Sequence, residues 1–190
     1  FFQTIEFKRE SREFVSCTGV YNGKRMTVLS TGIGCDNLDI VMNELDALVN
    51  IDFDTKEVKK ELKSLRILRI GTSGSIQPDI PVGAYVFSHI SLGADGLLNW
   101  YANRDEVSYK EMEEAFVRDV NWDENLPRPY FIKAADELVD LFKDCTHKGV
   151  TISASGFYGP QGRVLRIPLA MPDMLERFEK FRFEDYRITN

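Results

Sequence analysis

The sequence predicts an α/β fold in which a mixed central β-sheet is flanked by helices. Three observations lead to this expectation. The length of 190 residues suits one such domain. β-rich runs alternate along the chain with stretches of helical periodicity. The dipeptide Asn22-Gly23 joins two neighbouring runs as a hairpin, so part of the sheet is antiparallel. We therefore expect residues 1–190 to form a single domain.

The first elements follow from strand composition and turn chemistry. Residues 14–21 and 26–31 are rich in β-branched and aromatic side chains and flank the Asn22-Gly23 turn. Asp36 and Asn37 come next, and we expect them to cap a helix. The apolar residues of that helix recur at helical spacing and are Leu38, Val41, Leu45, Leu48 and Val49.

The rest of the chain continues the alternation of strands and helices. Further strands are expected over residues 66–71, 82–91 and 149–156. Further helices are expected over residues 110–118, 130–145 and 171–181, with Pro129 at the start of the second. Residues 92–109 read as a loop.

Composition argues against several classes of function. Twenty-four basic and thirty acidic residues give a net charge of −6, whereas a nucleic-acid-binding surface needs a basic surplus. The chain has neither an apolar run long enough to cross a bilayer nor a signal-peptide layout, so we expect a cytoplasmic protein with no membrane contact. The three cysteines are widely spaced and lack a CxxC motif. They predict small buried or half-buried side chains rather than disulfides or a zinc site.

The first candidate site is the strand-to-helix connection at 31–37. In α/β sheets, ligands gather where strands end in small residues. Gly32 and Gly34 resemble part of a dinucleotide-binding fingerprint, but Asn37 occupies the third glycine position. A tight turn that needs glycine for its backbone angles is the alternative interpretation.

The second candidate site is the end of the predicted strand at 66–71. Arg69 stands two residues before Gly71-Thr72-Ser73-Gly74. A guanidinium, hydroxyl groups and free backbone N–H groups together form a receptor for an oxyanion such as phosphate. The alternative is an arginine that pairs with a core carboxylate or faces outward at a sheet edge.

The third candidate site is the glycine-rich stretch at 153–162 and the arginine after it. Gln161 and Arg163 are two residues apart, so they point the same way in extended chain. Their donors and acceptor match a flat heterocycle whose edge presents a carbonyl, an N–H and a second carbonyl. Phe157 could cover the face of such a ring. A turn with solvated polar residues is the alternative.

Four motifs together resemble the nucleoside phosphorylase-I family, and within it the uridine phosphorylases. They are REF (12–14), STGIG (30–34), LRIGTSGSIQPDIPVG (68–83) and FYGPQGR (157–163). The resemblance implies a three-layer fold and the reversible phosphorolysis of uridine to uracil and ribose-1-phosphate in pyrimidine salvage. Phosphate is then a co-substrate, and no metal or organic cofactor is implied for the reaction.

The resemblance also implies a phosphate site. Arg69 and Thr72 match phosphate ligands with a catalytic role, and Thr72 also lies near the ribose. Arg12 matches an arginine that completes the phosphate site of a neighbouring subunit. The family therefore implies at least a homodimer, and usually a ring of dimers such as a hexamer.

The nucleoside site is carried over in the same way. Gly74 matches a backbone position beside the nucleoside. Gln161 and Arg163 match the pair that holds the uracil edge, Phe157 matches the aromatic wall, and Arg163 is the catalytic member of this set. The family histidine that reaches into a neighbour's ribose pocket would lie upstream of Phe1; His89 and His147 do not match it and are given no role.

Other parts of the family pattern differ here. Glu13 and the Ile33 carbonyl match a potassium site found at the dimer interface of some members, but Asn37 replaces a serine there. The family's Gly-Asp-Pro-x-Arg phosphate loop and its Glu-Met-Glu ribose segment would lie upstream of Phe1 and just after Asn190. We therefore expect the chain to be a fragment of a longer enzyme; the alternative is an incomplete polypeptide that is inactive alone.

Other functions stay open at this point. One is a purine nucleoside phosphorylase or a nucleosidase of the same family. Another is a non-catalytic homologue that binds nucleosides.

Overall fold

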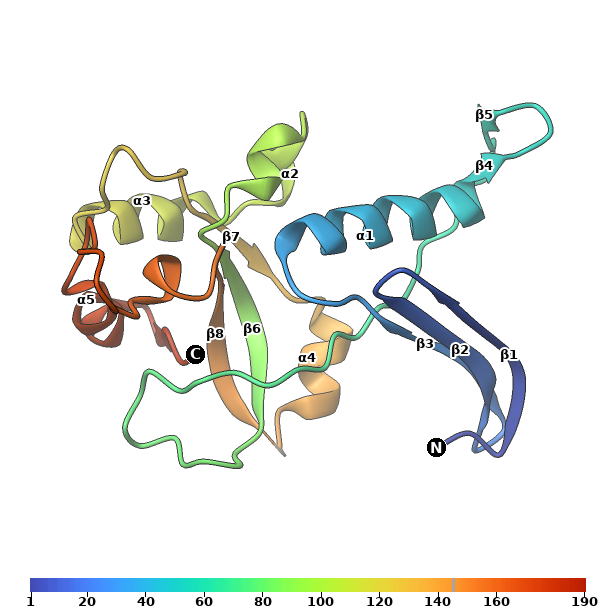
Figure 1. Ribbon diagram of the computed structural model, residues 1–190, viewed down its shortest axis with the longest axis horizontal. Helices are drawn as coiled ribbons and strands as arrows, with labels where there is room; N and C mark the ends of the chain where they lie inside the picture. Colours follow the sequence, from blue (N-terminus) through green and yellow to red (C-terminus); the bar gives the residue numbers. More distant parts are fainter. Residues whose placement is uncertain (145) are drawn as a thin grey trace. The chain divides into compact units, whose positions relative to one another are not determined.

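The computed structural model describes residues 1–144 and 146–190, and the chain divides into two compact units, 1–68 and 69–190. Figure 1 labels the longer helices and strands of each. Cys17 and Cys35 are half-buried free thiols, as predicted, whereas Cys145 lies outside the described residues. Within the described residues, no helix is both long and apolar enough to span a membrane.

The N-terminal unit contains an antiparallel sheet whose central strand is β2 (Phe14–Tyr21). The predicted hairpin is confirmed: Tyr21 pairs with Lys24 at the start of β3 (Lys24–Ser30), and Asn22 and Gly23 both have positive φ angles. Two left-handed residues are what a type I′ turn requires. The outer strand β1 (Thr4–Ser11) was not predicted, because it is exposed throughout and buries no apolar face.

The predicted helix of this unit is confirmed as α1 (Cys35–Asn50). It leads into the short pair β4 (Ile51–Asp52) and β5 (Glu57–Val58). The predicted capping by Asp36 and Asn37 is wrong. Gly34 takes the N-cap position at a φ of 108°, a conformation that glycine adopts readily, and the two polar residues lie in the first turn.

The C-terminal unit is built on a mixed sheet in the order β7–β6–β8. Its central strand β6 (Val86–Gly93) runs antiparallel to β7 (Tyr130–Lys133) and parallel to β8 (His147–Ser153). Beyond β8, Ile188 bridges to Val150 in parallel. The predicted mixed sheet is therefore confirmed.

One face of this sheet carries the hydrophobic core. Phe116 of α3 (Lys110–Asp119) lies at its centre, with ring centroids 5.3 Å from Phe131, 5.4 Å from Phe178 and 5.1 Å from Phe181. Phe178 belongs to α5 (Met174–Lys180). Each fully buried ring of this size contributes roughly 1.5–3 kcal/mol.

The opposite face of the sheet is covered by α4 (Asp136–Phe142). Phe142 stacks on Phe87 of β6 at 5.1 Å. Figure 1 draws α4 on the other side of β6 from α3 and α5. Helices therefore lie on both sides of the sheet, which is the predicted three-layer arrangement (Figure 1).

Two predicted elements are wrong. Residues 66–71 do not form a strand; they are exposed and irregular, because a β-rich run becomes a strand only where a neighbour supplies ladder hydrogen bonds. Residues 130–133 form β7 rather than the first turn of a helix, since Tyr-Phe-Ile suits a strand and only residues from Asp136 onward are helical.

The remaining differences are at boundaries. β6 begins four residues later than predicted, β8 begins two residues earlier, and α5 is shorter at both ends. The expected loop at 92–109 contains two short helical turns. The short elements of this unit are η1 (Leu97–Trp100), α2 (Arg104–Val107), η2 (Gly159–Gln161), β9 (Arg182–Phe183) and β10 (Tyr186–Arg187).

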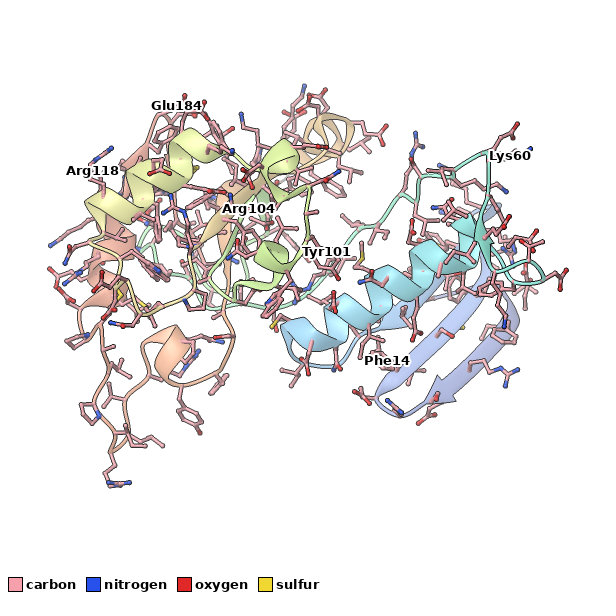
Figure 2. The ribbon with its side chains drawn as sticks, turned by 90° about the horizontal axis from the view of Figure 1, so that it is seen from above. Phe14, Lys60, Tyr101, Arg104, Arg118 and Glu184 are labelled. Atoms are coloured by element: carbon pink, nitrogen blue, oxygen red, sulfur yellow. The ribbon has the colours of Figure 1, made fainter. Side chains whose placement is uncertain are left out.

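A buried ion pair fixes the 97–107 segment to the core. Arg104 donates to Glu113 of α3 at 2.9 Å, and Glu113 is 2% exposed. The same carboxylate accepts the backbone N–H of Phe131 at 3.2 Å. Figure 2 shows Arg104 beside these elements. The charge is thus paired and hydrogen-bonded, as a buried carboxylate requires.

Candidate active site

The turn that follows β8 is closed by its own backbone. The N–H groups of Gln161 and Arg163 both donate to the Tyr158 carbonyl, at 3.0 and 2.9 Å. Gly162 has a φ of 71°, and a Cβ there would lie 2.8 Å from Leu175 of α5. Glycine is therefore required both for the backbone angle and for the close approach of the helix.

The three residues predicted to hold a heterocycle lie together on this turn. Arg163 Nη1 donates to the Phe157 carbonyl at 2.8 Å and to Gln161 Oε1. The guanidinium carbon lies 4.1 Å from the centroid of the Phe157 ring, a cation–π distance. Phe157 is 61% exposed, so it presents ring surface to solvent.

This arrangement leaves groups available for a ligand. Arg163 has five N–H donors and uses one of its nitrogens in the contacts above. Gln161 keeps its amide N–H₂ and the second lone pair of Oε1. The pair can therefore donate to carbonyl oxygens and accept from a ring N–H at one edge.

A cavity of about 640 Å³ adjoins the turn. This volume lies in the range that holds a small organic ligand. Arg163 and Arg166 supply charge in its wall, and the rest of the wall is mostly apolar. Its larger side chains include Trp122, Leu126, Tyr158, Leu165, Ile167 and Met174.

The base of this region is held by a carboxylate that sequence reasoning missed. Asp95 accepts hydrogen bonds from the hydroxyls of Tyr130 (2.7 Å) and Ser153 (2.8 Å) and from the Leu97 backbone N–H (2.8 Å). Gly93 makes room for the Tyr130 ring, since a Cβ there would lie 2.0 Å from it. The available signal was an acidic residue four positions after the end of the strand predicted at 82–91.

The predicted phosphate segment is differently organised. Arg69, Thr72 and Gly74 lie in the exposed, irregular stretch before Ile76. The guanidinium of Arg69 turns back over Gly71, with nitrogens 3.4 and 3.6 Å from where a Cβ of that glycine would lie. Within the described residues, no hydrogen bond, ion pair or ring contact joins Arg69, Thr72 or Gly74 to the Phe157–Arg163 turn. Their shared site stays a prediction.

In the N-terminal unit, Arg12 occupies the turn between β1 and β2 with a φ of 54° and is exposed. Its predicted role in a neighbouring subunit is therefore sterically open. Glu13 and Asn37 both flank Gly32, where a Cβ would lie 3.2 Å from Glu13 Cγ and 2.9 Å from Asn37 Nδ2. The proximity of these residues was expected from the resemblance.

The potassium site fits these residues poorly. Asn37 Nδ2 donates to the Ile33 carbonyl at 3.1 Å, so a hydrogen-bond donor faces the oxygen that would bind the ion. An amide N–H₂ offers no lone pair to a cation. We derive no step through this ion.

Comparison with known proteins points to one family. The profile of the phosphorylase superfamily matches residues 1–181. A uridine phosphorylase from Thermococcus kodakarensis is 28% identical over 152 residues, which are 80% of this chain and 44% of that protein. A uridine phosphorylase from Salmonella typhimurium is 32% identical over 155 residues, 80% of this chain and 48% of that protein.

A DeoD-type purine nucleoside phosphorylase from a Thermoanaerobacter species is 33% identical over 99 residues, 52% of this chain and 36% of that protein. Among solved structures, a Trypanosoma brucei nucleoside phosphorylase, described as showing uridine phosphorylase activity, superposes with a TM-score of 0.81 at 26% identity. That match covers 99% of this chain and 69% of the other. The chain spans about half the length of the curated relatives it matches.

Proposed function

The chain belongs to the phosphorylase superfamily, and from that premise we propose that it is part of a uridine phosphorylase. The reaction is the reversible conversion of uridine and phosphate to uracil and ribose-1-phosphate, a step of pyrimidine salvage. The observation that carries the proposal is the cluster of Arg163, Gln161 and Phe157 on one short turn. The named relatives support the same class of reaction.

The chemistry follows from where charge develops. Cleavage of the glycosidic bond leaves negative charge on the departing base and positive charge on the ribose. Arg163 and Gln161 donate to the base and stabilise its charge, as an oxyanion hole does. Each charge-assisted hydrogen bond contributes roughly 1.5–3 kcal/mol.

The phosphate has two roles in this proposal. Arg69 and Thr72 hold it beneath the ribose, where its charge stabilises the developing cation and its oxygen is the nucleophile. Holding both reactants in place removes much of the entropic cost of their encounter. Arg12 would complete this site from a neighbouring subunit, so the active form would be a homo-oligomer. We place the reaction in the cytoplasm, because free thiols such as Cys17 suit a reducing compartment.

A purine nucleoside phosphorylase is the second candidate, because DeoD-type purine enzymes are also among the relatives. The Gln161–Arg163 pair favours a pyrimidine, whose edge alternates carbonyl and N–H groups. Base preference therefore separates the two proposals.

The test is product formation by the full-length protein with and without inorganic phosphate. We expect uracil and ribose-1-phosphate from uridine only when phosphate is present, with adenosine and inosine left intact. Uridine cleavage without phosphate would show that the protein is a nucleosidase and not a phosphorylase. Faster cleavage of inosine or adenosine would favour the purine enzyme, and ligand binding without turnover would favour a non-catalytic homologue.

A further inference from the structure

The stretch that follows the predicted phosphate ligands is tied to the end of the chain. Asp79 and Arg187 form a bidentate ion pair, with Nη1–Oδ1 at 2.8 Å and Nη2–Oδ2 at 2.6 Å. Arg187 belongs to β10, so the pair joins residues 108 positions apart. Two parallel bonds fix orientation as well as distance.

Gln77 makes a second connection in the same place. It is 3% exposed, and its Nε2 donates to the Ile188 carbonyl at 2.6 Å and to the Glu179 carbonyl at 3.2 Å. Its Oε1 accepts from Arg187 Nη1 at 3.4 Å. Gln77 therefore joins the ion pair to the interior, and its amide is satisfied on both sides.

Backbone and polar contacts extend the attachment toward the phosphate ligands. The Ile76 N–H donates to the Thr189 carbonyl at 2.8 Å, and Asn190 Nδ2 donates to Ser73 Oγ at 2.6 Å. Ser73 is the residue between Thr72 and Gly74. The hydrogen bond from Asn190 to Ser73 therefore constrains the backbone on either side of Ser73, at Thr72 and Gly74.

Residues 69–74 have irregular backbone, so the hydrogen-bond ladder of a sheet does not hold their conformation. Contacts from residues 179–190, which include the C-terminal hairpin β9–β10, hold it instead. We propose that Gln77, Asp79 and Arg187 form a clamp that positions the Arg69–Gly74 segment to bind phosphate. The clamp residues touch no substrate in this proposal; they are positioning residues. The inference rests on the proposed function, because it assigns phosphate binding to that segment.

The test compares two exposed ion pairs of the same hairpin in the full-length protein. Asp79→Asn removes the negative charge that pairs with Arg187 and keeps a side chain of nearly the same size and shape. Asp185→Asn is the matched control, because Asp185 pairs with Lys148 of β8. The two pairs are similarly exposed: the side chains of Asp79 and Arg187 are 57% and 32% exposed, and those of Asp185 and Lys148 are 73% and 38% exposed. Both substitutions cost little in overall stability, because exposed pairs contribute little.

We expect Asp79→Asn to raise the KM for phosphate about tenfold and to leave the KM for uridine within about twofold, because small displacements of binding groups have large effects. Asp185→Asn should change neither. The charge-reversed double variant Asp79→Arg/Arg187→Asp should recover most of the phosphate KM. The proposal is overturned if Asp79→Asn behaves like Asp185→Asn, or if it raises both KM values together.

Amide hydrogen exchange separates the clamp from the enzyme assignment. Peptides covering residues 69–77 should exchange faster in Asp79→Asn than in wild type or Asp185→Asn. Equal exchange in all three proteins overturns the clamp, whatever their activity. Absence of phosphate-dependent uridine cleavage in wild type would instead overturn the proposed function, and the exchange result would still decide the clamp.

Discussion

The two halves of the candidate active site in the C-terminal unit are held in different ways. The Phe157–Arg163 turn is closed by hydrogen bonds among its own residues. The stretch from Ser73 to Asp79 is held by residues 102 to 117 positions away in the sequence. The turn is stabilised mainly by contacts within itself, whereas the second stretch depends on contacts with the C-terminal residues. The proposed base-binding half should therefore tolerate distant changes that the proposed phosphate-binding half does not.

The largest effect is expected at the turn. Arg163→Ala removes the proposed donor to the departing base and should lower kcat/KM for uridine about 100-fold, since one charge-assisted hydrogen bond is worth roughly 1.5–3 kcal/mol. Steady-state kinetics with uridine at saturating phosphate measure the loss. The thermal midpoint should change little, because the turn keeps its backbone hydrogen bonds.

The matched control for this variant is Arg118→Ala. Arg118 is an exposed arginine on α3 that pairs with the adjacent Asp119, and Figure 2 shows it at the outer surface. Its loss should leave kcat/KM unchanged. Unaltered uridine kinetics in Arg163→Ala would remove this arginine from the site.

A smaller and more selective effect is expected in the second half. Arg69→Ala should raise the KM for phosphate about tenfold, with a lesser change in the KM for uridine, because its guanidinium is assigned to the anion. Initial rates over a matrix of phosphate and uridine concentrations give both constants. A rise confined to the KM for uridine would contradict the division of the site into two halves.

Stability should respond at the Asp95 carboxylate, which accepts a hydrogen bond from Ser153 at the end of β8. Tyr130→Phe removes the hydroxyl that donates to Asp95 at 2.7 Å and should lower the free energy of unfolding by about 1 kcal/mol. Tyr85→Phe is the control, because Tyr85 is 77% exposed. Urea denaturation compares the two. Equal stability of both variants would show that the Tyr130–Asp95 hydrogen bond adds nothing to the stability of the fold.

The smallest effect is a pH dependence of the clamp. The hydrogen bonds from Arg187 hold the pKa of the Asp79 carboxyl below its ordinary value of 3.8. A depressed carboxyl pKa stabilises the folded state above the ordinary value, and this contribution is lost as pH falls through the lowered value. Asp79→Asn should therefore differ from wild type in thermal midpoint at pH 7 and converge with it below 3.8. A difference that persists in acid would contradict the ionic origin.

Local sequence signals predicted the local structures. The Asn22-Gly23 hairpin and helix α1 follow from turn chemistry and helical spacing. Gln161 and Arg163 do lie together, but the extended chain from which this was predicted is wrong: the helical turn η2 and the left-handed Gly162 bring them together. In each case the partners are close in sequence, so the pattern carries the information.

Contacts between distant residues could not be predicted in this way. Asp95 receives donors from the ends of two other strands, and Asp79 meets Arg187 only after the C-terminal hairpin has folded. The aliphatic run at 66–71 reads as a strand by composition, yet pairing decides whether a strand forms. Which distant segments pair with one another depends on the complete fold, so local patterns in one sequence do not predict it.

The most direct test is a crystal structure of the full-length protein with uracil and phosphate bound. We predict the uracil edge on Gln161 and Arg163 and the phosphate on Arg69 and Thr72, within one continuous site. An anion bound elsewhere, with the Arg69 side chain directed away from the Phe157–Arg163 turn, would contradict the account.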